Sequence, residues 1–357
     1  MDLINKLIKA EIIETKAYSV QKSSNSIKLD AMENPYTWPE EIKHLWLQHL
    51  KSTELNRYPD PNATSVLPAL RKVMQVPSEM KTILGNGSDE LIQIILMALP
   101  KDSVVLAPEP SFVMYKMIAT FLGLKFIGVP LAPDYSLDET TMDIAIKKHK
   151  PAVIFIANPN NPTGNIFDRE VITKLIKANS SLIILDEAYH SFANDSFMGD
   201  LSKYSNLLVM RTLSKMGLAG IRLGLLAGHK DWLDQFDKVR LPYNINILSQ
   251  ITAQFILEQP EILLQQTEKI KINRKKLMTD LNAIDQIKPI ESQANFILFK
   301  CPDADKIHQH LKKNKILVKN LSNYHPLLYN CLRVSIGTSS ENKMFIQALT
   351  TTISKDY

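Results

Sequence analysis

Seven short apolar runs recur between residues 82 and 226 and constrain the fold of this chain more than any other feature. Most of them are separated from the next by a segment with the apolar spacing of a helix. Continuous apolar runs are typical of strands buried on both faces, as in parallel sheets covered by helices. The pattern therefore predicts an α/β fold with a seven-stranded, mostly parallel sheet, whose strands contain residues 82–84, 104–106, 126–129, 153–156, 182–185, 207–210 and 223–226.

The pattern changes after Pro242. Helical spacing runs through 247–280, and strand signals return at 296–299 and 332–336, which predicts a smaller α+β domain. Residues 2–16 have helical spacing and predict a short N-terminal arm that packs against this smaller domain. A chain of 357 residues is long enough for two domains. We expect an arm and part of the small domain in 1–45, the large α/β domain in 46–245 and the small C-terminal α+β domain in 246–357.

Composition and charge exclude several classes of protein. With 45% hydrophobic and 22% charged residues, the chain is neither disordered nor collagen-like. The net charge is only +5, and the basic run 271–276 has the character of a solvated helix face, so we expect no nucleic-acid partner. Cys301 and Cys331 cannot build a disulfide framework, and the sequence predicts neither a signal peptide nor a bilayer span. We therefore expect a cytoplasmic protein without a membrane partner.

Polar loops follow four of the predicted strands, at the end of an open α/β sheet where ligands bind. The chain has only 11 glycines, and two of them lie in the loop 85–90. Ser88 in this loop can cap the helix that follows, and the N-terminus of that helix would bind an anion. The loop 158–164 combines prolines with asparagines and so fixes an irregular turn that aims amide side chains at the strand end. Taken alone, the loop 85–90 is equally compatible with an ordinary capped turn, whereas the density of turn residues directly after a buried strand favours a functional role for 158–164 over a rigid surface loop.

The other two loops carry charge. Asp186 and Tyr189 follow the run 182–185, and a carboxylate in that place is costly to desolvate unless it meets a cation. The loop 211–224 has two arginines, one lysine and three glycines but no acid, which suits a phosphate. A lysine held among cations, here Lys215, has a lowered pKa and can act as a nucleophile. Together the four loops supply what pyridoxal phosphate needs: a lysine for the Schiff base, an acid for the pyridine nitrogen and a phosphate cradle.

On these residues the sequence resembles the fold-type I, pyridoxal-phosphate-dependent aminotransferases, and more narrowly the histidinol-phosphate aminotransferase family. The NPTG element at 161–164, the Ser-Lys pair at 214–215 and the G-x-R element at 220–222 belong to the wider superfamily. The ENPY element at 33–36 and the NRYPD element at 56–60 mark the narrower family. The resemblance extends over nearly the whole chain.

The resemblance implies pyridoxal 5'-phosphate as the cofactor and no metal. Lys215 would form the Schiff base and move the substrate proton, and Asp186 would pair with the protonated pyridine nitrogen. Asn161 and Tyr189 would bond the 3-oxygen of the ring, and Phe112 would stack on its face, although a plain core aromatic remains an open alternative. The residues expected at the cofactor phosphate are Gly87, Ser88, Asp89, Ser214 and Arg222.

The resemblance also implies substrate contacts. Arg333 would bind the carboxylate of glutamate and the phosphate of the second substrate, because a fork of donors suits either anion. Lys319 stands where the family often has a second arginine, so its phosphate contact would be monodentate. Tyr18 and Asn34 are further pocket residues. Tyr58 would reach the phosphate in the other subunit, which implies a homodimer.

The activity implied is a histidinol-phosphate transaminase of histidine biosynthesis. It would transfer an amino group between L-glutamate or 2-oxoglutarate and imidazole-acetol phosphate or L-histidinol phosphate. The open alternatives on the same scaffold are an aromatic amino-acid aminotransferase and a decarboxylase of a phosphorylated amino acid. A pyridoxal-phosphate-binding regulator is the alternative from a different class.

Overall fold

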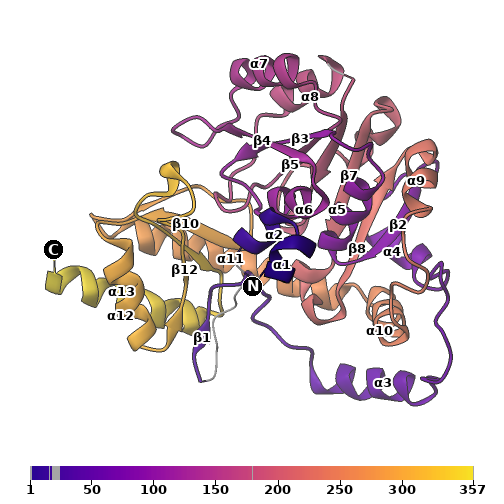
Figure 1. Ribbon diagram of the computed structural model, residues 1–357. Helices are drawn as coiled ribbons and strands as arrows, with labels where there is room; N and C mark the ends of the chain where they lie inside the picture. The colour runs from indigo at the N-terminus through magenta and orange to yellow at the C-terminus, as the bar shows by residue number, and fades with distance from the viewer. Residues whose placement is uncertain (1, 16, 18–24, 179, 357) are drawn as a thin grey trace.

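A seven-stranded sheet forms the centre of the larger of two lobes in the computed structural model, which describes residues 2–15, 17, 25–178 and 180–356 (Figure 1). Its order is β2-β8-β7-β6-β5-β3-β4, and β8 runs antiparallel to both of its neighbours while the other pairs are parallel. Each apolar run singled out in the sequence lies within one strand, so the predicted sheet is confirmed. The strands are β2 (Lys81–Asn86), β3 (Val104–Glu109), β4 (Lys125–Pro130), β5 (Val153–Ala157), β6 (Leu182–Asp186), β7 (Leu207–Thr212) and β8 (Leu223–Gly228).

The two faces of this sheet are buried in different apolar clusters. On β6, Ile183 and Leu185 pack into one cluster, while Leu182 and Ile184 pack into the other. Successive side chains of a strand point to opposite faces, so a strand covered on both sides needs an unbroken apolar run. The surrounding helices are α4 (Leu67–Val73), α5 (Ser88–Met97), α6 (Met114–Leu122), α7 (Glu139–His149), α8 (Arg169–Ala178), α9 (Lys230–Asp237) and α10 (Ile247–Leu257).

The smaller lobe holds an antiparallel sheet of order β12-β13-β10-β9 (Figure 1). Its strands are β9 (Lys288–Pro289), β10 (Phe296–Lys300), β12 (Lys319–Asn320) and β13 (Cys331–Ser335). The long helix α11 (Glu261–Asn282) runs from the large lobe toward it. Helices α12 (Ala304–Lys313) and α13 (Ser339–Asp356) complete the lobe, and a separate apolar cluster fills it.

The N-terminal segment touches both lobes. Strand β1 (Ile27–Lys28) pairs in parallel with β11 (Ile316–Leu317) of the smaller lobe. The arm itself forms two short helices, α1 (Asp2–Leu7) and α2 (Ala10–Glu14), and Lys9 between them donates to the carbonyl of Phe121 on α6 at 3.0 Å. The helical part of the arm therefore lies on the large lobe, where we had expected it on the small one.

Two remaining features lie away from the sheets. Helix α3 (Glu40–Lys51) has no buried residue and extends along the lower edge of Figure 1. Short 3₁₀ helices follow the ends of the strands: η1 (His190–Phe192), η2 (Met198–Lys203), η3 (Ser214–Met216), η4 (Ala219–Ile221) and η5 (Pro326–Leu328). Among the described residues, no helix combines the length and the apolar composition that a bilayer span requires.

Candidate active site

A cavity of about 100 Å³ lies where the carboxyl ends of β5, β6 and β7 meet the start of α5. The four polar loops predicted from the sequence all contribute to its wall, because the carboxyl ends of parallel strands share one edge of a sheet. The predicted residues that line it are Ser88, Asp89, Phe112, Asn161, Asp186, Tyr189, Ser214, Lys215 and Arg222. Met32, Ala157, Pro159, Ala188 and Thr212 line it as well and were not singled out in the sequence.

One end of the cavity is built for an anion. Gly87 precedes α5 with φ at 84° and ψ at 171°, a conformation open essentially to glycine alone. A Cβ atom there would lie 2.6 Å from Nη2 of Arg222, so the guanidinium packs directly on the bare backbone. Gly224 on β8 allows a similar approach, because its Cβ would lie 2.9 Å from the carbonyl carbon of Gly87. The glycines thus bring a strand, a helix start and a cation together.

Ser88 differs from its prediction in one respect. It is the first residue of α5, whereas Gly87 occupies the N-cap, and within the described part of the chain no side chain caps the helix. The expectation that Ser88 caps the helix is therefore wrong, because the capping position falls on the residue that must be glycine. As a result the N–H groups of the first turn are left available for a ligand. Asp89 lies 3.3 Å from Arg222, and its other carboxylate oxygen has no hydrogen-bond partner among the residues that the structure describes.

The hydroxyl groups at this end come from the turn between β7 and β8. Thr212 Oγ1 lies 2.8 Å from Ser214 Oγ, and the backbone N–H of Ser214 donates to Thr212 Oγ1 at 3.1 Å. Ser214 is the first residue of η3, and its contact with Thr212 directs it to the cavity. Lys215 is the next residue of η3 and lines the same cavity. Thr212 is thus a member of the site that the sequence analysis missed, although it lies two residues before a predicted one.

Lys215 is buried, and its pKa is lowered to about 8 from the ordinary 10.5. Burial is the main cause, and the positive charges of Arg333 and Arg222 add to it, while Glu33 opposes it. Its Nζ lies 5.7 Å from the centroid of the Tyr189 ring. The predicted lowering is confirmed, but loss of water contributes more than the neighbouring cations do.

Asp186 ends β6 inside the protein, and its hydrogen-bond partner is a phenol. The hydroxyl of Tyr115 donates to Oδ2 at 2.6 Å, and the N–H of Ala188 donates to Oδ1 at 3.1 Å. Burial raises the pKa of Asp186 to about 6, and these two donors oppose the rise. Tyr115 was not predicted from the sequence. It lies in the first turn of α6, three residues after Phe112, and no local pattern marks it as a partner of Asp186.

Arg211 and Glu187 form a buried ion pair on the other side of these strands. Nε and Nη2 of Arg211 both donate to Oε2 of Glu187, at 2.9 and 2.7 Å, and Nη1 donates to the carbonyl of Met74. Ser196 and the N–H of Phe197 also donate to the Glu187 carboxylate. From the sequence, Arg211 was expected among the cations of a phosphate loop. This expectation is wrong, because Arg211 joins β7 to the segment after β6 and does not line the cavity.

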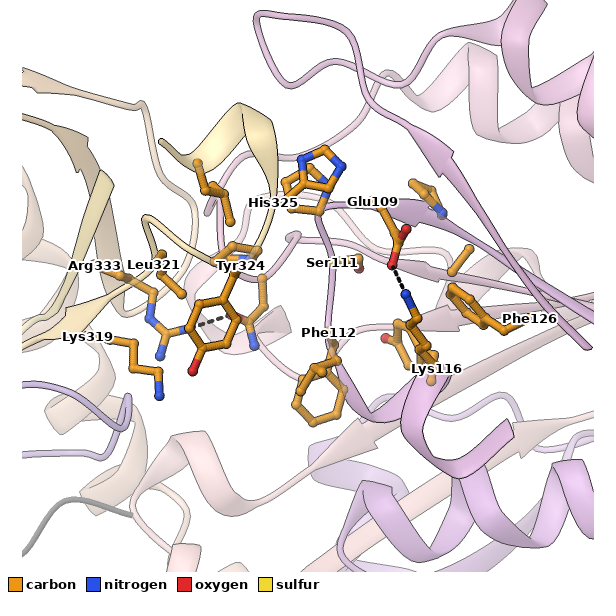
Figure 2. Close-up of a pocket in the computed structure, with 18 of the residues that line it drawn as sticks. Glu109, Ser111, Phe112, Lys116, Phe126, Lys319, Leu321, Tyr324, His325 and Arg333 are labelled. Carbon is orange, nitrogen blue, oxygen red and sulfur yellow. Dashed lines mark hydrogen bonds and ion pairs between the residues drawn. The ribbon is translucent and has the colours of Figure 1, made fainter. Parts of the chain in front are cut away.

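A second cavity of about 370 Å³ adjoins the first and shares Met32, Phe112 and Asn161 with it. Figure 2 shows Arg333 and Lys319 on one side of this cavity and the ion pair of Glu109 with Lys116, 4.0 Å apart, on the opposite side. It lies between the ends of β3 and β4 on the large lobe and residues 319–333 of the small one. Both lobes are therefore needed to enclose it.

Arg333 connects the two cavities. Its Nη1 donates to Oδ1 of Asn161 at 2.6 Å, and its Nη2 donates to the carbonyl of Asp30 at 3.1 Å. Its guanidinium carbon lies 5.2 Å from the centroid of the Phe296 ring. Lys319 lies 5.3 Å from the ring centroid of Tyr324, at the outer part of the same wall.

Asn34 and Tyr58, both predicted as site residues, line neither cavity. Asn34 donates to the carbonyl of Met216 at 3.2 Å and to Gln266 at 2.9 Å, directly behind the Lys215 turn. Tyr58 is 81% exposed and stacks on Tyr243 with ring centroids 4.6 Å apart. Tyr18 lies outside the described residues.

Comparison with known proteins agrees with this geometry. Residues 24–349 match the family model described as aminotransferase class I and II. The chain is 50% identical to histidinol-phosphate aminotransferase 2 of Nitrosococcus oceani, over 98% of each chain. It is 45% identical to histidinol-phosphate aminotransferase 1 of Ralstonia nicotianae, over 97% of this chain and 94% of that one. The crystal structure of histidinol-phosphate aminotransferase from Sinorhizobium meliloti in complex with pyridoxal-5'-phosphate has the same fold, with a TM-score of 0.86 at 21% identity over 98% of both chains.

Proposed function

The chain belongs to the class I and II aminotransferase family, and from this we propose that it is a histidinol-phosphate aminotransferase of histidine biosynthesis that uses pyridoxal phosphate. It moves an amino group from L-glutamate to imidazole-acetol phosphate, which gives 2-oxoglutarate and L-histidinol phosphate. The observation that carries the proposal is the cavity at the strand ends, where a buried lysine, a buried carboxylate and an anion cradle meet. The relatives that share nearly the full length of the chain are named for this substrate.

The donor set of the cavity fits pyridoxal phosphate, which when bound supplies an electron sink for the negative charge that develops at the substrate carbon. Arg222, the first turn of α5 and the hydroxyls of Ser88 and Ser214 are suited to the phosphate, since all of them offer donors or positive charge. Asp186 is the acid for the pyridine nitrogen. We assign Asn161 and Tyr189 to the ring oxygen and Phe112 to the ring face.

Lys215 has the properties of the proton carrier. Because its pKa is about 8 instead of 10.5, roughly a tenth of the amine is neutral at pH 7, far more than for an exposed lysine, and this fraction can act as a base or nucleophile. In each half-reaction Nζ would move a proton between the amino-bearing carbon of the substrate and the carbon of the cofactor that exchanges the amino group. The same amine would hold the cofactor before the substrate arrives.

Arg333 and Lys319 are suited to the anionic group of each substrate. Both lie in the wall of the larger cavity, and Arg333 also reaches Asn161 in the smaller one. A guanidinium can bind a carboxylate or a phosphate with two parallel bonds, whereas an ammonium offers a single point of charge. One arginine can therefore serve glutamate and histidinol phosphate in turn.

The test of the function is a set of half-reactions with the purified, cofactor-loaded enzyme. Histidinol phosphate and glutamate should each change the absorbance of the cofactor, whereas phenylalanine should do so much more slowly. Equal rates with phenylalanine would favour an aromatic aminotransferase. Release of carbon dioxide from a phosphorylated amino acid, without an oxoacid acceptor, would favour a decarboxylase.

The matched variant for this test is Arg333→Lys, which keeps the charge but removes the fork of donors. We expect the half-reactions with both anionic substrates to require a higher substrate concentration. Lys300→Arg, on the exposed end of β10, is the control and should leave both unchanged. If Arg333→Lys reacts like the unaltered enzyme, the substrate role of Arg333 is wrong.

We also propose that the enzyme is a homodimer in which Tyr58 completes the neighbouring active site. Tyr58, Leu55 and Leu241 are 81%, 69% and 70% exposed, so this part of the surface is apolar and uncovered in a single chain. Mixing inactive Tyr58→Ala and Lys215→Ala chains tests the proposal. If Tyr58 acts across the interface, each mixed dimer has one intact site and one site that lacks both residues. Random pairing of equal amounts makes about half of the dimers mixed, so the mixture should recover about a quarter of the activity of the unaltered enzyme. No recovery despite formation of mixed dimers would contradict it.

Two further parts of the proposal concern organisation and location. The apolar cluster of the smaller lobe supports two domains, a large one over 46–245 and a small one over 246–357, with 1–45 divided between the arm and the small domain. Helix α10 packs into a cluster of the large lobe, so it joins the two domains across this boundary. The two cysteines, Cys301 and Cys331, are both free, which suits a reducing compartment. We therefore place the enzyme in the cytoplasm.

A further inference from the structure

Tyr115 touches two of the residues assigned to the cofactor ring. Its hydroxyl donates to Oδ2 of Asp186 at 2.6 Å. Its ring lies edge-on to Phe112, with centroids 5.6 Å apart, and is stacked on Phe155 of β5 at 4.8 Å. Tyr115 is fully buried, so both contacts are made without competition from water.

The direction of this hydrogen bond is fixed by the chemistry of the pair. Burial and the negative charge of Asp186 raise the pKa of the Tyr115 phenol well above its ordinary value, so the phenol keeps its proton and is the donor. A donor stabilises the ionised form of the carboxylate that accepts from it. The other charged groups that influence Asp186 are Asp89 on α5 and Lys215 on η3, whereas Tyr189, on the loop after β6, acts on the Tyr115 phenol.

Stacking on Phe155 holds the hydroxyl in place. Phe155 belongs to a central strand and is completely buried, so the Tyr115 ring has a rigid neighbour on one face. The backbone N–H of Ala188 supplies the donor to the other oxygen of Asp186. Between them, the two donors determine the plane of the carboxylate that faces the cavity.

We propose that Tyr115 is a positioning residue that keeps Asp186 ionised and oriented toward the pyridine nitrogen of the cofactor, and that also places Phe112 against the ring. This inference rests on the proposed function, because it assigns Asp186 to that nitrogen. Without the phenol, the carboxylate would have a higher affinity for a proton. It would then draw the proton from the pyridine nitrogen, and the ring would be a weaker electron sink.

The test is Tyr115→Phe in the full-length, cofactor-loaded enzyme, which removes one oxygen and keeps the ring. A hydrogen bond to a charged group corresponds to a shift of about 1 to 2 pH units in the proton affinity of Asp186. With cofactor labelled with ¹⁵N at the ring nitrogen, the chemical shift at neutral pH should move toward that of a neutral pyridine. We also expect kcat to fall about 10- to 100-fold while KM for histidinol phosphate changes less than about twofold.

Two controls separate positioning from a general loss of structure. Tyr135→Phe also removes the hydroxyl of a buried tyrosine, here one that donates to the carbonyl of Leu327 at 2.9 Å, and it should leave the ¹⁵N shift unchanged. In an Asp186→Asn background, Tyr115→Phe should add no further change to the ¹⁵N shift, because the amide does not ionise. An equal effect of Tyr115→Phe in both backgrounds would overturn the proposal.

A second measurement covers the case in which Tyr115→Phe does not fold. A fluorinated tyrosine at position 115 keeps the ring and the hydroxyl but is a stronger donor, so it should hold the proton more firmly on the ring nitrogen at high pH. An unchanged ¹⁵N titration would overturn the proposal. Failure of the unaltered enzyme to react with histidinol phosphate would instead refute the proposed function, whatever Tyr115 does.

Discussion

Replacing Gly87 with alanine tests whether the phosphate end of the cavity depends on a bare backbone. At φ 84° and ψ 171° a side chain is strained, which costs about 1 to 3 kcal/mol in the folded state. The added methyl group would also lie 2.6 Å from Nη2 of Arg222 and 3.1 Å from its Cζ. Because those atoms are at the end of a flexible side chain, the guanidinium can move away, and the contact with the phosphate is lost with it.

The size of the binding defect follows from that lost contact. A hydrogen bond between charged groups contributes about 1.5 to 3 kcal/mol, so we expect the dissociation constant of pyridoxal phosphate to rise about 10- to 100-fold. The assay is titration of the apoenzyme with cofactor, followed by absorbance. Urea unfolding of the same apoenzyme measures the strain separately from the binding.

Gly199→Ala is the matched control, because a Cβ atom at Gly199 would meet nothing within 4 Å. It should leave cofactor affinity unchanged and the free energy of unfolding equal or slightly higher. Cofactor binding by Gly87→Ala as tight as that of the unaltered enzyme would refute the reasoning. A loss of stability without a loss of affinity would show that the backbone matters but the Arg222 contact does not.

Two further predictions concern the buried charges. In the apoenzyme the pKa of Lys215 is about 8 in the folded state against 10.5 ordinarily, so the unfolded chain binds more protons between these values and the free energy of unfolding rises with pH there. Lys215→Met should therefore be more stable than the unaltered apoenzyme at pH 7 and should lose this advantage toward pH 10, as measured by urea unfolding. A stability difference that does not change with pH would contradict the lowered pKa of Lys215. Arg211→Met, which leaves Glu187 buried and without its cation, should lower the free energy of unfolding by about 3 to 5 kcal/mol, and Arg211→Met with Glu187→Met should recover much of that loss. A double variant as unstable as the single one would show that the pair itself is required.

The sheet could be predicted from the sequence because its strands are buried on both faces. In β5 and β6 every position from Val153 to Ala157 and from Leu182 to Asp186 is buried, so the apolar runs are unbroken and easy to recognise. Lys215 and Asp186 could be predicted as well, since Asp186 is the last residue of such a strand and Lys215 lies three residues after the end of another. The strand ends determine where these side chains meet, and no long-range information is needed.

Other parts of the site depend on contacts that local sequence does not contain. Tyr115 is 71 residues from Asp186, and nothing in its surroundings marks it as a donor to a carboxylate. Arg211 belongs to a cationic stretch of sequence, but it lies in β7, where the carboxylate of Glu187, 24 residues earlier, pairs with its charge. Gly87 takes the capping position that Ser88 was expected to fill, because the close approach of Arg222 excludes any side chain there.

The hydrogen bond between Arg333 and Asn161 has a consequence for how the two halves of the reaction communicate. It joins Arg333 of the small sheet to Asn161 in the turn after β5. The proposed binding site of the substrate anion in the larger cavity is thereby bonded to the proposed partner of the ring oxygen in the smaller one. The guanidinium cannot turn toward an incoming anion without changing what Oδ1 of Asn161 accepts. Any influence of the bound anion on the ring must, by thermodynamic linkage, be matched by an equal influence of the ring on affinity for the anion. With Arg333 at the substrate anion and Asn161 at the ring oxygen, as proposed above, this hydrogen bond would couple the affinity for each substrate to the state of the cofactor.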